Sequence, residues 1–271
     1  MSDGVPIRTI APGLLDEDSG LPDDGLPPCD LCHGLRRVKA DVGPAHPLFA
    51  QFIPCPRCRG AVKRQQLERR FRERRRRIER YSQLVGRARR QTFSNFELRR
   101  DEEHTELVRE AFRAARAFAG EPEGWLFLYG SRGTGKSHLA AAIANHLLAP
   151  SGAEQKSLVL FMTVPGLLNL LRSGFERGDH ENLLALTKEV DVLILDDLGV
   201  ERVNDWVRET LYEVTHARWQ TESPLVVVSN LRPEGLEPRL RDRLMDDDLT
   251  TVVKVAAPTY RQRKRNPGLV L

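Results

Sequence analysis

The sequence lacks the features that mark exported and membrane-inserted proteins. No apolar run approaches the ~20 residues that a membrane-spanning helix needs. The first residues carry no basic cluster followed by an apolar stretch, so no signal peptide is expected. Cysteine is scarce, with 4 residues in 271, and without export the thiols are expected to stay reduced. These absences predict a cytoplasmic protein without a membrane partner, in which cysteines bind metal or remain free.

Basic charge is concentrated in one segment. Residues 63–90 hold thirteen basic and three acidic residues, a net charge of +10, so the rest of a chain of formal charge +4 sums to −6. With no Pro and one Gly, residues 61–91 are compatible with a single long helix. A solvated linker helix is the simple interpretation, but like charges at i,i+4 repel unless a partner neutralises them. Nucleic-acid phosphate and an acidic protein surface are equally suitable partners.

The four cysteines form two C-x-x-C pairs separated by 22 residues. Each pair is followed by a glycine two positions on, Gly34 and Gly60, which would let a turn expose backbone N–H groups to the sulfurs. Four thiolates suit a tetrahedral, structural Zn²⁺, although the gap exceeds the usual 15–20 residues. His33 and His46 are possible substitute ligands, and a redox pair is the alternative. The expected zinc ligands are Cys29, Cys32, Cys55 and Cys58.

A phosphate-binding loop is the most informative motif. The pattern G-x-x-x-x-G-K-[ST] fits residues 130–137 without a mismatch, after a strand-like run (125–129) and before an Ala-rich helical segment. In such a loop, backbone N–H groups surround the phosphates, Lys136 reaches the β- and γ-phosphates, and the Ser137 hydroxyl binds Mg²⁺. The sequence therefore predicts ATP binding through Gly130, Ser131, Arg132, Gly133, Thr134, Gly135, Lys136 and Ser137.

Three further strand-like runs (157–162, 190–195 and 225–229) alternate with helical patterns, which predicts an α/β fold with a parallel sheet flanked by helices. The second of these runs ends in Asp196 and Asp197. Such a strand is expected beside the P-loop strand, with Asp196 holding magnesium and Asp197 orienting or deprotonating the attacking water. The alternative is a buried strand that exits through a polar turn. The last run ends at Asn230, which either contacts the γ-phosphate or the lytic water, or is a turn residue.

The order of these motifs resembles the AAA+ ATPases of the DnaC/DnaI helicase-loader and IstB transposition-helper group. The resemblance covers roughly residues 91–265 and includes an aromatic lead-in, 91–96, which in the family lies near the adenine. The matching blocks are Gly130–Ser137, Leu195-Asp196-Asp197-Leu198-Gly199, Asp205–Glu213, Ala217-Arg218-Trp219 and Val228-Ser229-Asn230-Leu231.

The resemblance also implies roles for arginines that would otherwise be surface residues. In the group, a stretch like residues 237–244 supplies an arginine finger that reaches ATP in the neighbouring subunit. The match places Arg243 first and Arg239 second for this role, and Arg261 as a second nucleotide sensor. AAA+ proteins usually have Glu where Asp197 stands, and the shorter side chain fits slow, partner-stimulated turnover.

The implied function is that of a DnaC-like helicase loader in DNA replication, an ATPase that binds ATP and Mg²⁺, self-associates, contacts single-stranded DNA and delivers the replicative helicase. The alternatives are an IstB-like helper of a DNA transposase and an ATP-switched binding adaptor with negligible hydrolysis. The expected organisation is a disordered acidic leader (1–28), a small zinc-ribbon-like module (29–60), a basic helix or linker (61–91), an AAA+ domain (92–265) and a tail (266–271).

Overall fold

The computed structural model describes residues 6–8, 25–27, 29–97, 105–149 and 157–256. The chain divides into two compact units, Met1–Arg74 and Arg75–Leu271, which are described separately. Most of the expected acidic leader, Arg261 and the expected tail lie outside the described residues. Among the described residues, no helix combines the length and apolar character needed to cross a membrane.

The first unit contains a small antiparallel sheet in the order β1-β2-β3. The strands are β1 (Ile7–Arg8), β2 (Arg37–Ala40) and β3 (Phe52–Pro54), and Val38 of β2 is paired with Ile53 of β3. Among the described residues of this unit, the buried ones are Val38, Ala40 and three of the four cysteines. So few apolar side chains cannot stabilise a fold on their own, so this unit needs a covalent or metal cross-link.

The basic helix is shorter than the sequence predicts. Helix α1 (Arg59–Tyr81) begins in the first unit, and its residues from Arg75 onward belong to the second. The prediction of one helix over 61–91 was wrong at its C-terminal end because the following residues bind the edge strand of the large sheet. The backbone N–H of Gln83 donates to Phe161 O (2.8 Å), and its side-chain Oε1 accepts from the N–H of Thr163 (2.7 Å). Two short 3-10 helices follow, η2 (Ala88–Arg90) and η3 (Phe93–Asn95).

The second unit is built on a five-stranded sheet in which every pairing is parallel. All four strand-like runs of the sequence form strands, and a fifth strand, β8, was not predicted. The order is β5-β6-β7-β4-β8. The strands are β4 (Trp125–Tyr129), β5 (Val159–Thr163), β6 (Val192–Leu198), β7 (Leu225–Ser229) and β8 (Thr250–Lys254).

This strand order corrects one expectation. Strand β6, which carries Asp196 and Asp197, does not lie beside the P-loop strand β4, because β7 is inserted between them. Periodicity identifies a buried parallel strand but not its neighbours, which depend on how the crossover helices pack. The insertion places Asn230, which follows β7, between the P-loop and the acidic pair.

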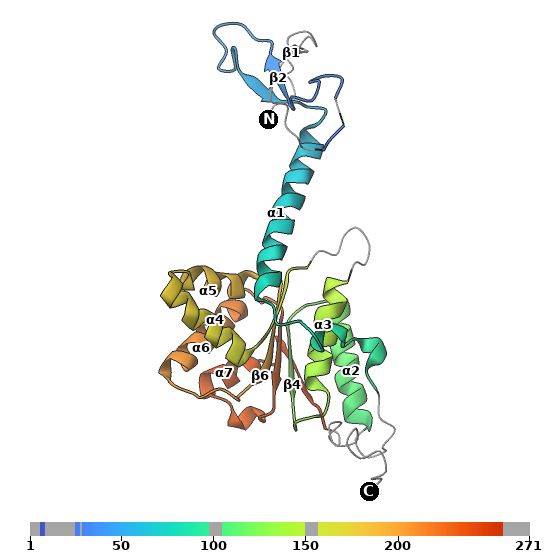
Figure 1. The fold of residues 1–271 in the computed structure, drawn as a ribbon, viewed down its shortest axis with the longest axis vertical. Coiled ribbons are helices and arrows are strands. Elements are labelled where there is room, and N and C mark those ends of the chain that lie inside the picture. Colours follow the sequence, from blue (N-terminus) through green and yellow to red (C-terminus); the bar gives the residue numbers. More distant parts are fainter. Residues whose placement is uncertain (1–5, 9–24, 28, 98–104, 150–156, 257–271) are drawn as a thin grey trace. The chain divides into compact units, whose positions relative to one another are not determined.

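Helices cover both faces of the sheet (Figure 1). One face packs against α2 (Thr105–Gly120) and α3 (Lys136–Leu148), with the alanines of α3 allowing a close approach to the strands. The other face is covered by α4 (Val164–Arg177), α5 (His180–Glu189), α6 (Asp205–Gln220) and α7 (Pro238–Leu244), with η4 (Pro233–Gly235) before α7. The sheet is therefore buried on both sides, and its loops at the strand ends remain available for a site.

Arg218 has a structural role in this layer. Its side chain is fully buried, and its guanidinium donates hydrogen bonds to five backbone carbonyls. These bonds tie the end of α5 to the starts of β6 and β7 and satisfy most donors of the buried guanidinium, which the negative charge of Asp191 also favours. The acceptors are the carbonyls of Thr187, Lys188, Val190, Asp191 and Pro224.

Candidate nucleotide site and cysteine cluster

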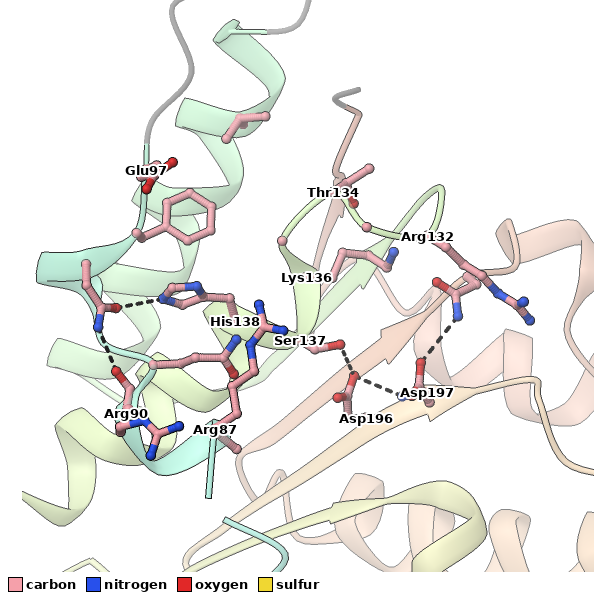
Figure 2. A pocket seen from close by; sticks show the side chains of 18 of the residues that line it. Arg87, Arg90, Glu97, Arg132, Thr134, Lys136, Ser137, His138, Asp196 and Asp197 are labelled. Atoms are coloured by element: carbon pink, nitrogen blue, oxygen red, sulfur yellow. Dashed lines mark hydrogen bonds between the residues drawn. The ribbon is translucent and has the colours of Figure 1, made fainter. Parts of the chain in front are cut away.

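A cavity of about 1020 Å³ lies at the carboxyl ends of β4, β6 and β7. This is the edge of a parallel sheet where ligands bind in open α/β folds. Figure 2 shows Lys136 and Ser137 facing Asp196 and Asp197, with Arg90 and His138 toward the other end. The cavity thus brings together most of the predicted site residues. The predicted site residues that line it are Arg132, Gly133, Thr134, Gly135, Lys136, Ser137, Asp196, Asp197 and Asn230.

The P-loop glycines are required by the backbone. Gly130 and Gly135 have φ angles of +142° and +105°, which residues other than glycine rarely adopt. A Cβ on Gly130 would also collide with the carbonyl oxygen of Val255, and a Cβ on Gly135 would lie 2.9 Å from the ring of Phe96. The loop can therefore present its N–H groups to phosphate only with glycine at these positions.

Lys136 is held inside the loop. Only 4% of it is exposed, and its ammonium group donates to the carbonyls of Gly130 (2.8 Å) and Ser131 (2.7 Å). Burial lowers the pKa of Lys136 to about 8, against the opposing effect of Asp196 and Asp197. Phosphate oxygens would supply the missing negative partner and favour the charged form.

Ser137 and Asp196 form an oxygen pair suited to magnesium. The Ser137 hydroxyl donates to Oδ1 of Asp196 at 3.0 Å, and Asp196 is 6% exposed. Burial, followed by the negative charge of Asp197, raises the pKa of Asp196 to about 6. A hydroxyl and a carboxylate are hard oxygen ligands that Mg²⁺ prefers alongside phosphate and water, so this donor set fits the ion.

Asp197 and Asn230 meet across two strands. The pairing of β6 with β7 shifts register between Leu195 and Leu198, and Asp197 has φ +58° within this irregularity. The shift redirects Asp197 into the cavity, where its Oδ1 accepts a hydrogen bond of 3.3 Å from the Asn230 amide. A carboxylate and an amide held together can orient a water molecule against a phosphate.

Two side chains of α3 that sequence reasoning missed hold the lead-in to this domain. His138 Nε2 lies 3.0 Å from both Thr92 O and Asn95 Oδ1. Since both partners are acceptors, Nε2 carries the proton, and burial lowers the pKa of this histidine. Two helical turns further along α3, the Asn145 amide donates to the carbonyls of Ala88 (2.8 Å) and Gln91 (2.7 Å). The sequence contains no local signal for these contacts, which join residues about fifty positions apart.

These bonds shape the end of the cavity away from the acidic pair. Phe96 packs edge-on against His138, with ring centroids 5.1 Å apart, and both residues line the cavity. An aromatic ring, amide groups and arginines at this end match the needs of a nucleotide base and ribose. The other lining residues here are Arg87, Ala88, Arg90, Gln91, Asn95, Glu97 and Val108.

The two candidate finger arginines, Arg243 and Arg239, lie on α7 and do not line the cavity of their own chain. The Arg243 guanidinium lies 3.9 Å from the ring centroid of Trp219, and that of Arg239 lies 5.8 Å from Tyr212. Their role in a neighbouring copy stays a prediction. Arg261, the expected second sensor, is outside the described residues.

In the first unit, the four cysteine sulfurs gather within 4.8 Å of one another, and none forms a disulfide. The Sγ atoms of Cys29 and Cys55 are 3.8 Å apart, and those of Cys32 and Cys58 are 3.5 Å apart. A tetrahedral site with Zn–S of ~2.3 Å has S···S distances of about 3.8 Å, so the cluster fits Zn²⁺. Neither His33 nor His46 belongs to it.

The backbone around the cysteines differs between the two pairs. Gly34 has φ +94°, as a tight turn after the first pair requires. A hydrogen bond from the backbone N–H of Leu31 is the main cause that lowers the pKa of Cys29 to about 7. Gly60, expected to serve a similar turn, is instead the second residue of α1. Helix α1 starts directly after Cys58, and the helix rather than a glycine turn arranges the second pair.

Comparison with known proteins places the site in a family. The model of the family described as IstB-like ATP binding protein matches residues 61–266. The replicative helicase loader DnaI of Bacillus subtilis (strain 168) is 34% identical over 113 residues, which are 41% of this chain and 35% of that protein. The replicative helicase loader DnaC of Escherichia coli (strain K12) is 30% identical over 141 residues, 50% of this chain and 56% of that protein.

The fold agrees with these relatives. A crystal structure of DnaI matches with a TM-score of 0.51 at 27% identity, covering 65% of this chain and 96% of that one. The chain therefore spans only about a third to three fifths of the length of the curated relatives it matches, whereas the solved DnaI structure is matched along nearly its whole length.

Proposed function

Because this chain belongs to the family of IstB-like ATP binding proteins, in the AAA+ group that includes DnaC and DnaI, we propose that it is an ATP-hydrolysing loader of a replicative helicase. The ATPase part of the proposal is carried by the convergence of Lys136, the Ser137–Asp196 pair and the Asp197–Asn230 pair in one cavity, and the loader part by the similarity to DnaC and DnaI.

In the proposed reaction each group has a separate task. Lys136 leaves the carbonyls of Gly130 and Ser131 and binds the β- and γ-phosphate oxygens. Ser137 and Asp196 would hold Mg²⁺, which would neutralise charge on the phosphates. Asp197 accepts a proton from the attacking water, and Asn230 orients that water toward the γ-phosphorus. His138 and Asn145 keep residues 88–96 against the base.

We further propose that catalysis needs a second copy of the chain. The cavity of one chain contains no arginine from α7, and an arginine that stabilises charge on the transferred phosphoryl group raises turnover by ~10³–10⁵-fold. Arg243 of a neighbouring copy is the first candidate for this group, and Arg239 the second. Assembly on the helicase or on single-stranded DNA then controls hydrolysis, so that ATP acts as a timer for release of the partner.

The first unit and α1 are proposed to hold the partner. Four thiolates leave Zn²⁺ no open position, which suits a structural rather than a catalytic metal. Helix α1 carries eleven basic and three acidic residues, and Arg69–Glu73 and Arg75–Glu79 are ion pairs along its surface. The remaining positive charge suits an acidic protein surface or nucleic-acid phosphate.

A co-purification experiment tests the loader role. The tagged full-length chain, with ATP and Mg²⁺, is offered a hexameric replicative helicase and, separately, an IS21-type transposase, with Lys136→Ala as the control that cannot bind ATP. We expect nucleotide-dependent capture of the helicase. Capture of the transposase alone would reject the loader and support the helper role that the name of the family model favours.

Phosphate release measured with and without single-stranded DNA tests the catalytic part. We expect slow basal release that rises when DNA or the helicase is added. If Asp197→Asn left release and partner capture unchanged while Lys136→Ala abolished capture, the chain would be a nucleotide-switched adaptor rather than an ATPase.

A further inference from the structure

One side of α6 carries three stacked aromatic rings. Tyr212, His216 and Trp219 are spaced at i, i+4 and i+7, which places them in line on a helix. The rings of Tyr212 and His216 are 5.1 Å apart and within 8° of parallel, and those of His216 and Trp219 are 5.8 Å apart and within 15°. We call these three residues the α6 stack.

Both candidate finger arginines rest on the α6 stack. Arg243 lies over Trp219 at 3.9 Å, and Arg239 lies over Tyr212 at 5.8 Å. The distance for Arg243 is within the range of a strong cation–π contact, and that for Arg239 is close to its limit. The stack therefore holds Arg243 more firmly than Arg239.

The positive charge of Arg243 has no acidic partner among the described residues. Its Nε is buried and forms no hydrogen bond within them, and its side chain is half-buried. The neighbouring Arg241 differs, since it lies 3.6 Å from Asp242. A guanidinium that is held by an aromatic face and not by a carboxylate keeps its charge available for an anion.

The indole of Trp219 is itself fixed. Its Nε1–H donates a hydrogen bond of 2.7 Å to Oδ2 of Asp246, in the loop before β8. Asp246 Oδ1 accepts from the N–H of Asp248 (3.2 Å), and its carbonyl accepts from Leu249 and Thr250. The carboxylate of Asp246 is thus engaged by Trp219 and the loop, and the Trp219 ring is held in one orientation under Arg243.

We propose that Trp219, oriented by Asp246, is a positioning residue that presents Arg243 to the nucleotide of a neighbouring copy of this chain. The inference rests on the proposed role of Arg243 as a residue that acts between subunits. A guanidinium on a long flexible side chain loses rotamer freedom when it binds phosphate, and a fixed aromatic support reduces that loss in advance. Trp219 acts on the partner's site and not on the cavity of its own chain, whose walls it does not reach.

Mixed assemblies of full-length variants test whether Trp219 acts on the nucleotide site of the neighbouring copy. Lys136→Ala chains keep Arg243 but lose their own site, and Arg243→Ala chains keep their site but lose the finger. Each alone is expected to hydrolyse ATP poorly, and a mixture is expected to recover activity. Trp219→Leu is then introduced into one chain type at a time.

We expect Trp219→Leu to reduce the recovered kcat at least about fivefold when it is placed in the Lys136→Ala chains, which donate Arg243. Placed in the Arg243→Ala chains it should have no effect, and Trp219→Phe, which keeps an aromatic face but loses the bond to Asp246, should restore part of the activity. Trp206→Leu, on the same helix but packed against Arg172, is the matched control and should have no effect in either chain.

The outcomes separate the inference from the proposed function. The positioning role of Trp219 would be overturned if Trp219→Leu reduced the recovered activity in both chain types. It would also be overturned if the substitution reduced the activity in neither chain type. Full activity of Arg243→Ala alone, or failure of the unmodified mixture to recover, would reject Arg243 as the finger and the inference with it.

Discussion

The side-chain amide of Asn230 donates a hydrogen bond to Oδ1 of Asp197 at 3.3 Å. The two residues end neighbouring strands, and the register shift in β6 turns Asp197 toward β7. Because β7 lies next to the P-loop strand, this pair is placed where it can respond to the γ-phosphate. Both groups must reorganise when water and phosphate occupy the cavity, which makes the pair a direct test of the proposed chemistry.

Replacing Asp197 with Asn removes the base but keeps the size of the side chain and an oxygen that Asn230 can reach. We expect ATP turnover to fall by about 10²-fold or more, with nucleotide affinity within a few-fold of the original chain. Phosphate release and binding of a fluorescent ATP analogue measure the two effects. Asp205→Asn, an exposed acid at the start of α6, serves as the control and should retain full turnover. Equal loss of binding and turnover would show that Asp197 is not the base.

Removing the His138 imidazole should affect nucleotide binding more than chemistry. His138→Ala loses the contacts to Thr92 and Asn95, each worth about 1 kcal/mol, so we expect the KM for ATP to rise about tenfold with little change in kcat. Asn145→Ala should act in the same direction through Ala88 and Gln91. His180→Ala, on α5, is the control. A fall in kcat at unchanged KM would contradict a role in holding the base side of the cavity.

The raised pKa of Asp196 predicts an unusual pH dependence. Its folded pKa of about 6 lies above the ordinary 3.8, so the folded protein binds this proton more tightly than the unfolded chain. Above pH 6 the buried carboxylate is ionised and costs stability, on the order of 2 kcal/mol, and this cost disappears as the pH falls from 6 toward 4. Asp196→Asn should therefore raise the melting temperature of the protein without nucleotide or Mg²⁺ at pH 7.5, and raise it much less at pH 5.

The same variant should lose stabilisation by ATP and Mg²⁺, because a neutral amide replaces the carboxylate that would hold the metal. Thermal melts at both pH values, with and without the nucleotide, provide the measurement, and Asp205→Asn serves as the matched variant at an exposed acid. An equal rise in the melting temperature of Asp196→Asn at pH 7.5 and at pH 5 would show that burial of the charge is not the cause.

The cysteine cluster predicts one Zn²⁺ for each chain. Metal analysis should find close to one equivalent, and less than about half an equivalent would argue against the site. A chelator or Cys32→Ser should make residues 29–60 sensitive to protease, since their few buried side chains cannot hold the unit together without metal. Basal ATP turnover by the second unit should persist, and its loss would show that the cluster supports the nucleotide site.

Local motifs were readable from the sequence because they act through neighbouring residues. The P-loop needs glycine at positions with positive φ and a helix that begins at Lys136, and both requirements are written in eight consecutive residues. The buried strands were equally clear from their apolar runs. Strand β8 was not predicted, although residues 250–255 are rich in the β-branched side chains that favour a strand.

The tertiary structure alone decided which distant residues meet. Strand order is set by the packing of crossover helices, so the insertion of β7 beside β4, and with it the Asp197–Asn230 contact, had no local signal. The end of α1 at Tyr81 likewise had no local signal, because it depends on the hydrogen bonds of Gln83 to the edge strand. The contact of Arg243 with the ring of Trp219 also depends on the folded structure. The sequence alone determined the chemistry of ATP binding, because a phosphate loop is a local backbone structure. How that chemistry is controlled depends on contacts between residues far apart in the chain, and only the folded sheet and its helices bring those together.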